Sequence, residues 1–73
     1  MSTLTAQQLV LKIRSHGLSQ AEIARRAGLS QGAVSHIETG RRKQVYAHTL
    51  DSLRRIAATL DRQQKRAQTG VAA

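Results

Sequence analysis

Residues 20–37, QAEIARRAGLSQGAVSHI, decide how this chain folds. Apolar residues recur at helical spacing on both sides of Gly28, a residue type that ends helices because it adopts a positive φ at little cost. Ser30 has the side chain of a helix cap, which accepts a hydrogen bond from a backbone N–H of the first turn. The stretch therefore predicts two short amphipathic helices joined by a tight turn.

Helix signals continue on both sides of this stretch. Thr5 followed by Gln8, and Ser19 followed by Glu22, have the spacing of a capping box. Together the signals predict an all-α fold with helices near 6–16, 20–27, 31–39 and 50–61. We expect one core, formed by the apolar face of each helix: Ala6, Leu9, Val10, Ile13, Ile23, Ala24, Ala27, Val34, Ile37, Leu50, Leu53, Ile56, Ala57 and Leu60.

The composition limits what such a chain can do. Its 73 residues form one domain, and 12 Lys and Arg against 4 Asp and Glu give a formal net charge of +8, which favours a polyanionic partner. The absence of Cys excludes disulfides and thiolate metal sites, and the three His residues lack the spacing of a zinc site. We expect no metal and no cofactor. An enzyme is the least favoured class, because paired carboxylates and a phosphate-cradling glycine loop are also missing.

Composition also bears on the type of target and on location. Tyr46 is the only aromatic residue, so the chain cannot form the stacking platform of many single-strand and RNA binders, which favours a double-stranded target. No apolar run approaches the ~18 residues of a membrane span, and no leader is apparent, so we expect a cytoplasmic protein without membrane contact. From Arg62 the apolar period is lost, which predicts a domain at 1–61 and a basic, disordered tail at 62–73.

The predicted helix at 31–39 exposes small groups. When its two large apolar residues point to the core, a helical wheel places Gly32, Ser35, His36 and Thr39 on the outward face. Glycine gives up about 1 kcal/mol of helix propensity relative to alanine, a loss that is tolerated where DNA must come close. Ser35 can bond to a base or a phosphate, and His36 can donate to guanine or to a phosphate.

A basic cluster follows this helix directly. Arg41, Arg42 and Lys43 are placed to bind the phosphate backbone beside the groove, which positions a protein on DNA without reading its sequence. One of the arginines can instead enter a narrow minor groove.

The segments LSQAEIARRAGLSQGAVSHIETGRR and TLDSLRRIAATL resemble the helix-turn-helix family of the Cro and lambda-type phage repressors, also called the XRE family, over residues 4–61. The resemblance implies a four- to five-helix DNA-binding domain, often dimeric, that binds operator half-sites through its third helix. It implies that Gln20 touches a phosphate and supports a reading residue, and that Gln31 reads a base, since an amide can bond adenine twice. The base-reading candidates are then Gln31, Gly32, Ser35 and His36, and the phosphate-binding candidates are Ser19, Gln20, Ser30, Thr39, Arg41, Arg42 and Lys43.

The sequence departs from the family pattern in two places. Glu38 matches a family carboxylate that often pairs with an Arg of the first helix, but the corresponding position here is Ile13. Its partner is therefore Lys12, Arg14 or a backbone donor, unless it stays exposed. The chain also lacks the Pro that is common soon after the third helix, so the geometry of that loop is not predicted.

These observations predict a sequence-specific protein that binds double-stranded DNA, most simply a phage- or plasmid-type transcriptional repressor. A homodimer is possible, and no small-molecule ligand is expected. The alternative is a DNA-recognition subunit of a phage packaging or recombination complex, or an antitoxin, because one fold serves several functions.

Overall fold

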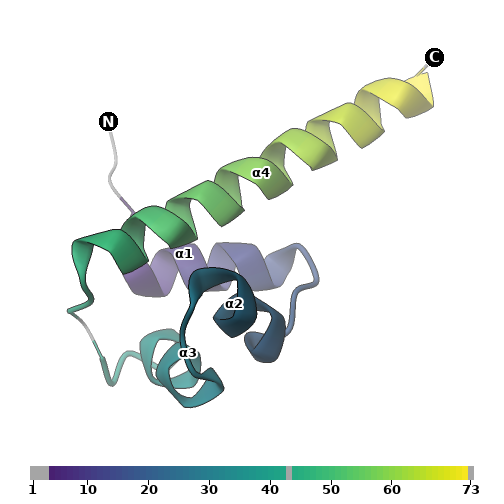
Figure 1. The fold of residues 1–73 in the computed structure, drawn as a ribbon. Helices are drawn as coiled ribbons and strands as arrows, with labels where there is room; N and C mark the ends of the chain where they lie inside the picture. The colour runs from purple at the N-terminus through teal and green to yellow at the C-terminus, as the bar shows by residue number, and fades with distance from the viewer. Residues whose placement is uncertain (1–3, 43, 73) are drawn as a thin grey trace.

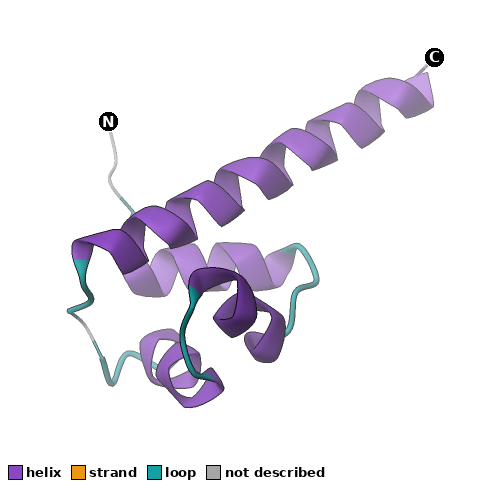
Figure 2. Ribbon diagram, in the orientation of Figure 1, coloured by secondary structure: helices purple, strands orange, loops and turns teal. Residues whose placement is uncertain are grey.

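The computed structural model describes the backbone of residues 4–42 and 44–72 and the side chains as far as residue 64 (Figure 1). These residues form four helices, which confirms the all-α prediction: α1 (Ala6–Ser15), α2 (Gln20–Ala27), α3 (Gln31–Glu38) and α4 (Ala47–Ala72). The three short helices form a body along one side of the long α4, and α3 lies on the side of that body opposite α4 (Figure 1). Short loops connect α1, α2 and α3 (Figure 2).

Side-chain caps fix where the short helices begin. Thr5 and Gln8 form the predicted capping box: the Gln8 N–H donates to Thr5 Oγ1 at 3.1 Å, and the Thr5 N–H donates to Gln8 Oε1 at 2.9 Å. At the start of α3, the Ala33 N–H donates to Ser30 Oγ at 3.1 Å. Each bond satisfies a backbone donor that the helix itself leaves without a partner, so the first turn is stabilised locally.

The cap of α2 differs from the prediction. The Glu22 N–H donates to Ser19 Oγ at 3.2 Å, so Ser19 is the N-cap as expected. The Glu22 carboxylate, however, pairs with Arg25 and Arg26 one turn along α2. The hydrogen bond from Arg25 is the main cause that holds the pKa of Glu22 below its usual value. Two arginines within reach are stronger partners for a carboxylate than one backbone N–H, so only half of the capping box forms.

One hydrophobic core joins all four helices. Every residue that the sequence assigned to the core is buried except Leu50, which is partly buried and packs against it. The largest fully buried side chains are Ile13 of α1, Ile23 of α2, Ile37 of α3 and Leu53 of α4. Because each helix contributes a large apolar residue to the same core, the position of each depends on the other three.

The helix predicted at 50–61 is longer at both ends. It begins at Ala47, and the Leu50 N–H donates to the Tyr46 carbonyl at 3.0 Å, which closes its first turn. Thr49 is a poor helix former, but it is 2 % exposed, and this burial outweighs its propensity. At the other end the backbone stays helical to residue 72, where we predicted a disordered tail. The sequence DRQQKRAQ contains mostly strong helix formers and no Pro, so nothing stops the helix after Leu60.

A small polar cluster ties α1 to α4 at the edge of the core. Lys12 Nζ lies 2.8 Å from Asp61 Oδ2, and His16 Nε2 lies 3.0 Å from Asp61 Oδ1. The hydrogen bond from Lys12 is the largest cause that lowers the pKa of Asp61 below its usual value of 3.8, with His16 adding to it against the effect of burial. Asp61 therefore favours its charged form in the folded protein.

Two glycines give opposite predictions for stability. Gly28 has a φ of +71°, so Gly28→Ala should lower the free energy of unfolding by about 1–2 kcal/mol through backbone strain alone, since nothing crowds an added Cβ. Gly32 is helical and also has open space around it, so Gly32→Ala should raise that free energy by about 0.5–1 kcal/mol. Urea denaturation of both variants measures the two changes. Changes of the same sign in the free energy of unfolding of the two variants would contradict these assignments.

The Asp61 cluster predicts a loss of stability in acid. The folded pKa of Asp61 is lower than the unfolded one, so its contribution is complete above pH 3.8 and is lost as the pH falls through the folded pKa. Asp61→Asn should therefore unfold more easily than wild type near neutral pH, and the difference should shrink as the pH falls below 3.8. Denaturant titrations over this range test it, and a difference that stays constant with pH would rule the ion pair out.

Candidate nucleic-acid interface

The turn between α2 and α3 is held by backbone hydrogen bonds and by close packing. Gly28 ends α2 in the left-handed region, its N–H donates to the Ala24 carbonyl, and the Leu29 N–H donates to the same oxygen at 2.8 Å. Ala24 is 5 % exposed, so its side chain belongs to the core beside this turn. The result is a helix-turn-helix arrangement in which α2 supports α3 from one side.

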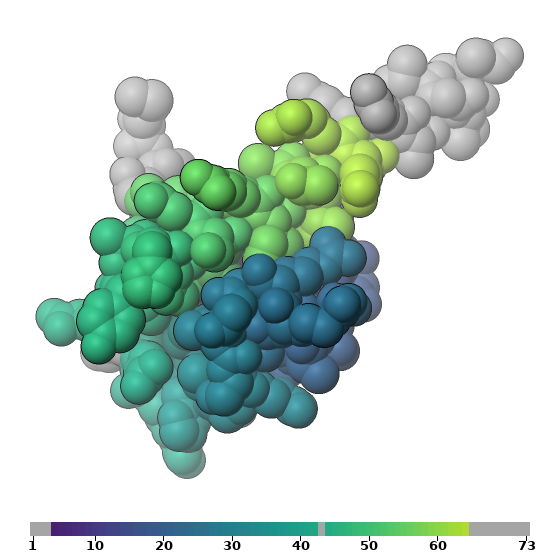
Figure 3. Space-filling model, viewed as in Figure 1, coloured from purple at the N-terminus to yellow at the C-terminus, as the bar shows by residue number. Residues whose placement is uncertain are grey.

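α3 presents a polar edge to solvent. Val34 and Ile37 are fully buried, whereas Gln31, Gly32 and His36 are exposed. Ser35 is only half-buried, although the helical wheel put it fully outward. Figure 3 shows the atoms of α3 at the bottom of this view, whereas those of α4 run along the top.

Gly32 has no structural reason to be glycine within the chain. Its backbone is helical, and a Cβ built on it would meet no atom within 4 Å. A helical glycine in open space weakens α3 and gains no packing in return. The backbone of α3 at Gly32 is therefore open to solvent and accessible to an external partner.

The three hydroxyls predicted to bind phosphate differ in what they can offer. Ser19 and Ser30 accept from backbone N–H groups at the starts of α2 and α3, so each keeps its hydroxyl hydrogen to donate. Thr39 instead donates to the Ser35 carbonyl at 3.0 Å and the His36 carbonyl at 3.4 Å. The hydrogen of Thr39 is thus engaged within α3, which makes Thr39 the weakest of the three candidates.

Gln20 makes a contact that sequence reasoning missed. Its Nε2 donates to Glu38 Oε1 at 2.9 Å, and Arg14 Nε lies 3.5 Å from the same oxygen. Arg14 was one of the predicted partners of Glu38, and the structure shows this pair. The bond to Gln20 joins residues at the start of α2 and the end of α3, and no local sequence signal reports a contact across a turn.

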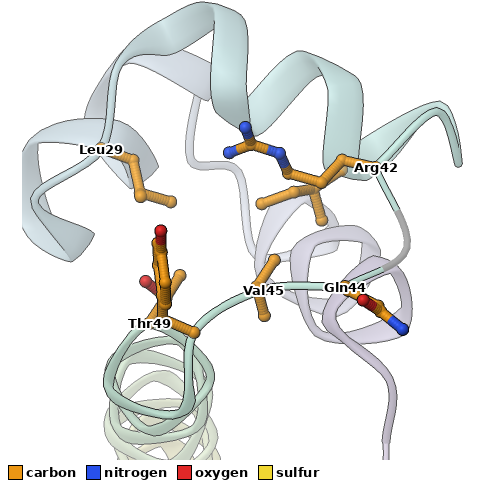
Figure 4. Close-up of a pocket in the computed structure, with 7 residues that line it drawn as sticks. Leu29, Arg42, Gln44, Val45 and Thr49 are labelled. Atoms are coloured by element: carbon orange, nitrogen blue, oxygen red, sulfur yellow. The ribbon is translucent and has the colours of Figure 1, made fainter.

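The loop after α3 carries the predicted basic cluster. The Arg42 N–H donates to the His36 carbonyl at 3.0 Å, which fixes the loop against the end of α3. The Arg42 side chain extends toward Leu29 beside a hollow of about 370 Å³ (Figure 4). Arg41 is exposed, and Lys43 lies outside the described residues. The other residues that line the hollow are Ile37, Gln44, Val45, Tyr46 and Thr49.

The arginines of the loop after α3 have no acidic partner among the residues that the structure describes. All four acidic residues have basic partners: Glu22 pairs with Arg25 and Arg26, Glu38 with Arg14, Asp51 with Arg54, and Asp61 with Lys12 and His16. Within residues 4–42 and 44–64, neither Arg41 nor Arg42 takes part in an ion pair. The loop beside α3 therefore keeps its positive charge for an anionic partner.

The family assignment follows from comparison with known proteins. The sequence model of a family described as a helix-turn-helix domain matches residues 7–69. The chain belongs to the helix-turn-helix family of the Cro and lambda-type repressors. No curated protein and no solved structure matched it. The matched region of this helix-turn-helix domain continues past residue 61, where the sequence predicted the end of the domain.

The helix-turn-helix family to which the chain belongs binds DNA. No group of three or more metal-ligating side chains occurs within the described part of the chain. None of its helices combines the length and apolar character needed to cross a membrane.

Arg42 gives a direct test of the electrostatic part of the interface. Arg42→Ala should weaken binding to different duplexes by a similar factor and lower the slope of log affinity against log salt by about one unit. Arg55→Ala is the matched control, because Arg55 is also exposed but belongs to α4, away from α3. Fluorescence anisotropy over a salt series measures both slopes. An unchanged slope for Arg42→Ala, or an equal change for Arg55→Ala, would exclude the phosphate contact.

Proposed function

We propose that this helix-turn-helix protein is a sequence-specific regulator of transcription that reads double-stranded DNA with α3, most simply a repressor of phage or plasmid type. The observation that carries the proposal is the exposed edge of α3, which is polar, small and held firmly because Val34 and Ile37 are fully buried behind it. A helix of this kind fits the major groove, where each base pair presents its own pattern of donors and acceptors.

Each exposed residue of α3 has a proposed part. Gln31 at the first position of α3 reads adenine, since its amide donates to one ring atom and accepts from the neighbouring amino group. His36 donates to guanine. Ser35, from its half-buried position, forms a hydrogen bond to a base or a phosphate that lies close to α3. Gly32 lets the backbone of α3 approach the base edges.

The proposed phosphate contacts lie on two sides of α3. On one side is the start of α2, where the first backbone N–H groups and the helix dipole favour an anion, next to Ser19 and Gln20. On the other side is the loop with Arg41 and Arg42, which Lys43 follows in the sequence. Two anchored sides fix how far α3 enters the groove, and the bases then decide affinity.

The proposal extends to assembly and location. A two-fold dimer would place two α3 helices on half-sites about one helical turn apart, and would account for a pseudo-palindromic operator. We propose the cytoplasm as its location, because bacterial and phage DNA is found there.

The test of base reading is Gln31→Ala. It should relax the base preference at one position of the half-site, costing about 1–3 kcal/mol there and little elsewhere. Gln63→Ala is the matched control, since it removes the same amide from an exposed position on α4. Competition binding with single-base variants of the site measures the pattern. A loss that is equal for all sequences would show that Gln31 does not read a base.

A further inference from the structure

Glu38 is the last residue of α3, and it contacts both other short helices. Its carboxylate accepts from Gln20 Nε2 of α2 at 2.9 Å and lies 3.5 Å from Arg14 Nε of α1. The side chain of Glu38 is 20 % exposed, so solvent screens these contacts less than it screens those of Glu22 and Asp51. One carboxylate thus connects the start of α2, the end of α3 and α1.

The carboxylate sets the orientation of the Gln20 amide. A carboxylate only accepts hydrogen bonds, so the nitrogen of the amide must face Glu38 and the oxygen cannot. Gln20 then has one N–H and its carbonyl oxygen left to offer to other partners. Without Glu38, rotation about the last side-chain bond would exchange the two ends of the amide at little cost.

The charge of Glu38 also needs a counter-charge. A bare carboxylate at the start of α2 would repel the phosphate that this turn is proposed to bind. Arg14 supplies the positive charge, and its Nη1 also lies 3.5 Å from the Leu18 carbonyl in the loop before α2. Arg14 therefore neutralises Glu38 and contacts the segment that leads into the anion-binding turn.

The backbone of Glu38 is held by a separate contact. Gln7 Nε2 of α1 donates to the Glu38 carbonyl oxygen at 3.0 Å, and the core residue Ile37 is fully buried beside it. Removal of the Glu38 carboxylate leaves both of these contacts in place. The effect of the carboxylate on Gln20 can thus be tested while α3 stays anchored.

We propose that Glu38 is a positioning residue for DNA binding, which holds the Gln20 amide in the orientation that donates to a phosphate at the start of α2. The inference rests on the proposed function, and it assigns a role to a residue that contacts the phosphate-binding candidate Gln20. Arg14 belongs to the same device, because it balances the charge of Glu38.

A double-mutant cycle on the full chain tests the proposal, with affinity for a selected duplex as the readout. Glu38→Ala should lower affinity about tenfold, the size expected for a hydrogen bond to a charged group, as Gln20→Ala does, and neither variant should lower the salt slope, because neither removes a cationic side chain. In the Gln20→Ala background, Glu38→Ala should cost less than about twofold, since its effect passes through Gln20. Glu38→Gln keeps an oxygen acceptor for Gln20 but can also donate to it, so it should restore only part of the affinity that Glu38→Ala loses.

Controls separate positioning from folding and from charge. Asp51→Ala removes the same charge from α4, and it should leave affinity and slope near wild type. Thermal melting of each variant shows whether binding is measured on folded protein. An equal loss from Glu38→Ala with and without Gln20, or no rescue by Glu38→Gln, would overturn the inference. A Gln20→Ala variant that binds like wild type would also overturn the inference. In that case the proposed function still stands if Gln31→Ala changes base preference.

Discussion

α3 is eight residues long, too short to be stable by itself in water, so its place depends on burial of Val34 and Ile37 against the rest of the core. Burial of one face forces the opposite edge outward, and the left-handed Gly28 sets the direction in which α3 leaves α2. The exposed edge with Gln31, Gly32 and His36 is the consequence of this constraint. On the other side of the core, α4 packs against the short helices, and the ion pairs between α1 and α4 hold it there.

Local rules of sequence predicted most of this fold. Thr5, Ser19 and Ser30 marked where three helices begin, because a cap is decided by a side chain and a backbone N–H three residues away. The core residues followed from helical periodicity for the same reason. The limits of α4 could not be predicted in this way, since the burial of Thr49 depends on tertiary packing that no local pattern contains.

The candidate site was predictable only in part. A helical wheel gave the exposed edge of α3 but placed Ser35 too far outward, and it had no means to show that Thr39 uses its hydroxyl within α3. Gln20 contacts Glu38, and Arg42 lines one hollow with Leu29; both pairs combine residues from segments that the turn brings together. Contacts of that kind depend on the three-dimensional arrangement and not on spacing in the chain.

Charge is arranged so that the interface keeps its positive potential. Each acidic residue forms an ion pair with a nearby basic side chain. Arg41 and Arg42 beside α3 form no ion pair among the described residues. The central claim is that this charge brings the protein to DNA and the edge of α3 then reads sequence. Selection of bound duplexes from a random pool, at near-physiological salt, tests it most directly. We predict that the selected duplexes share a short consensus; selection that enriches no common sequence, with equal affinity for all duplexes, would contradict the account.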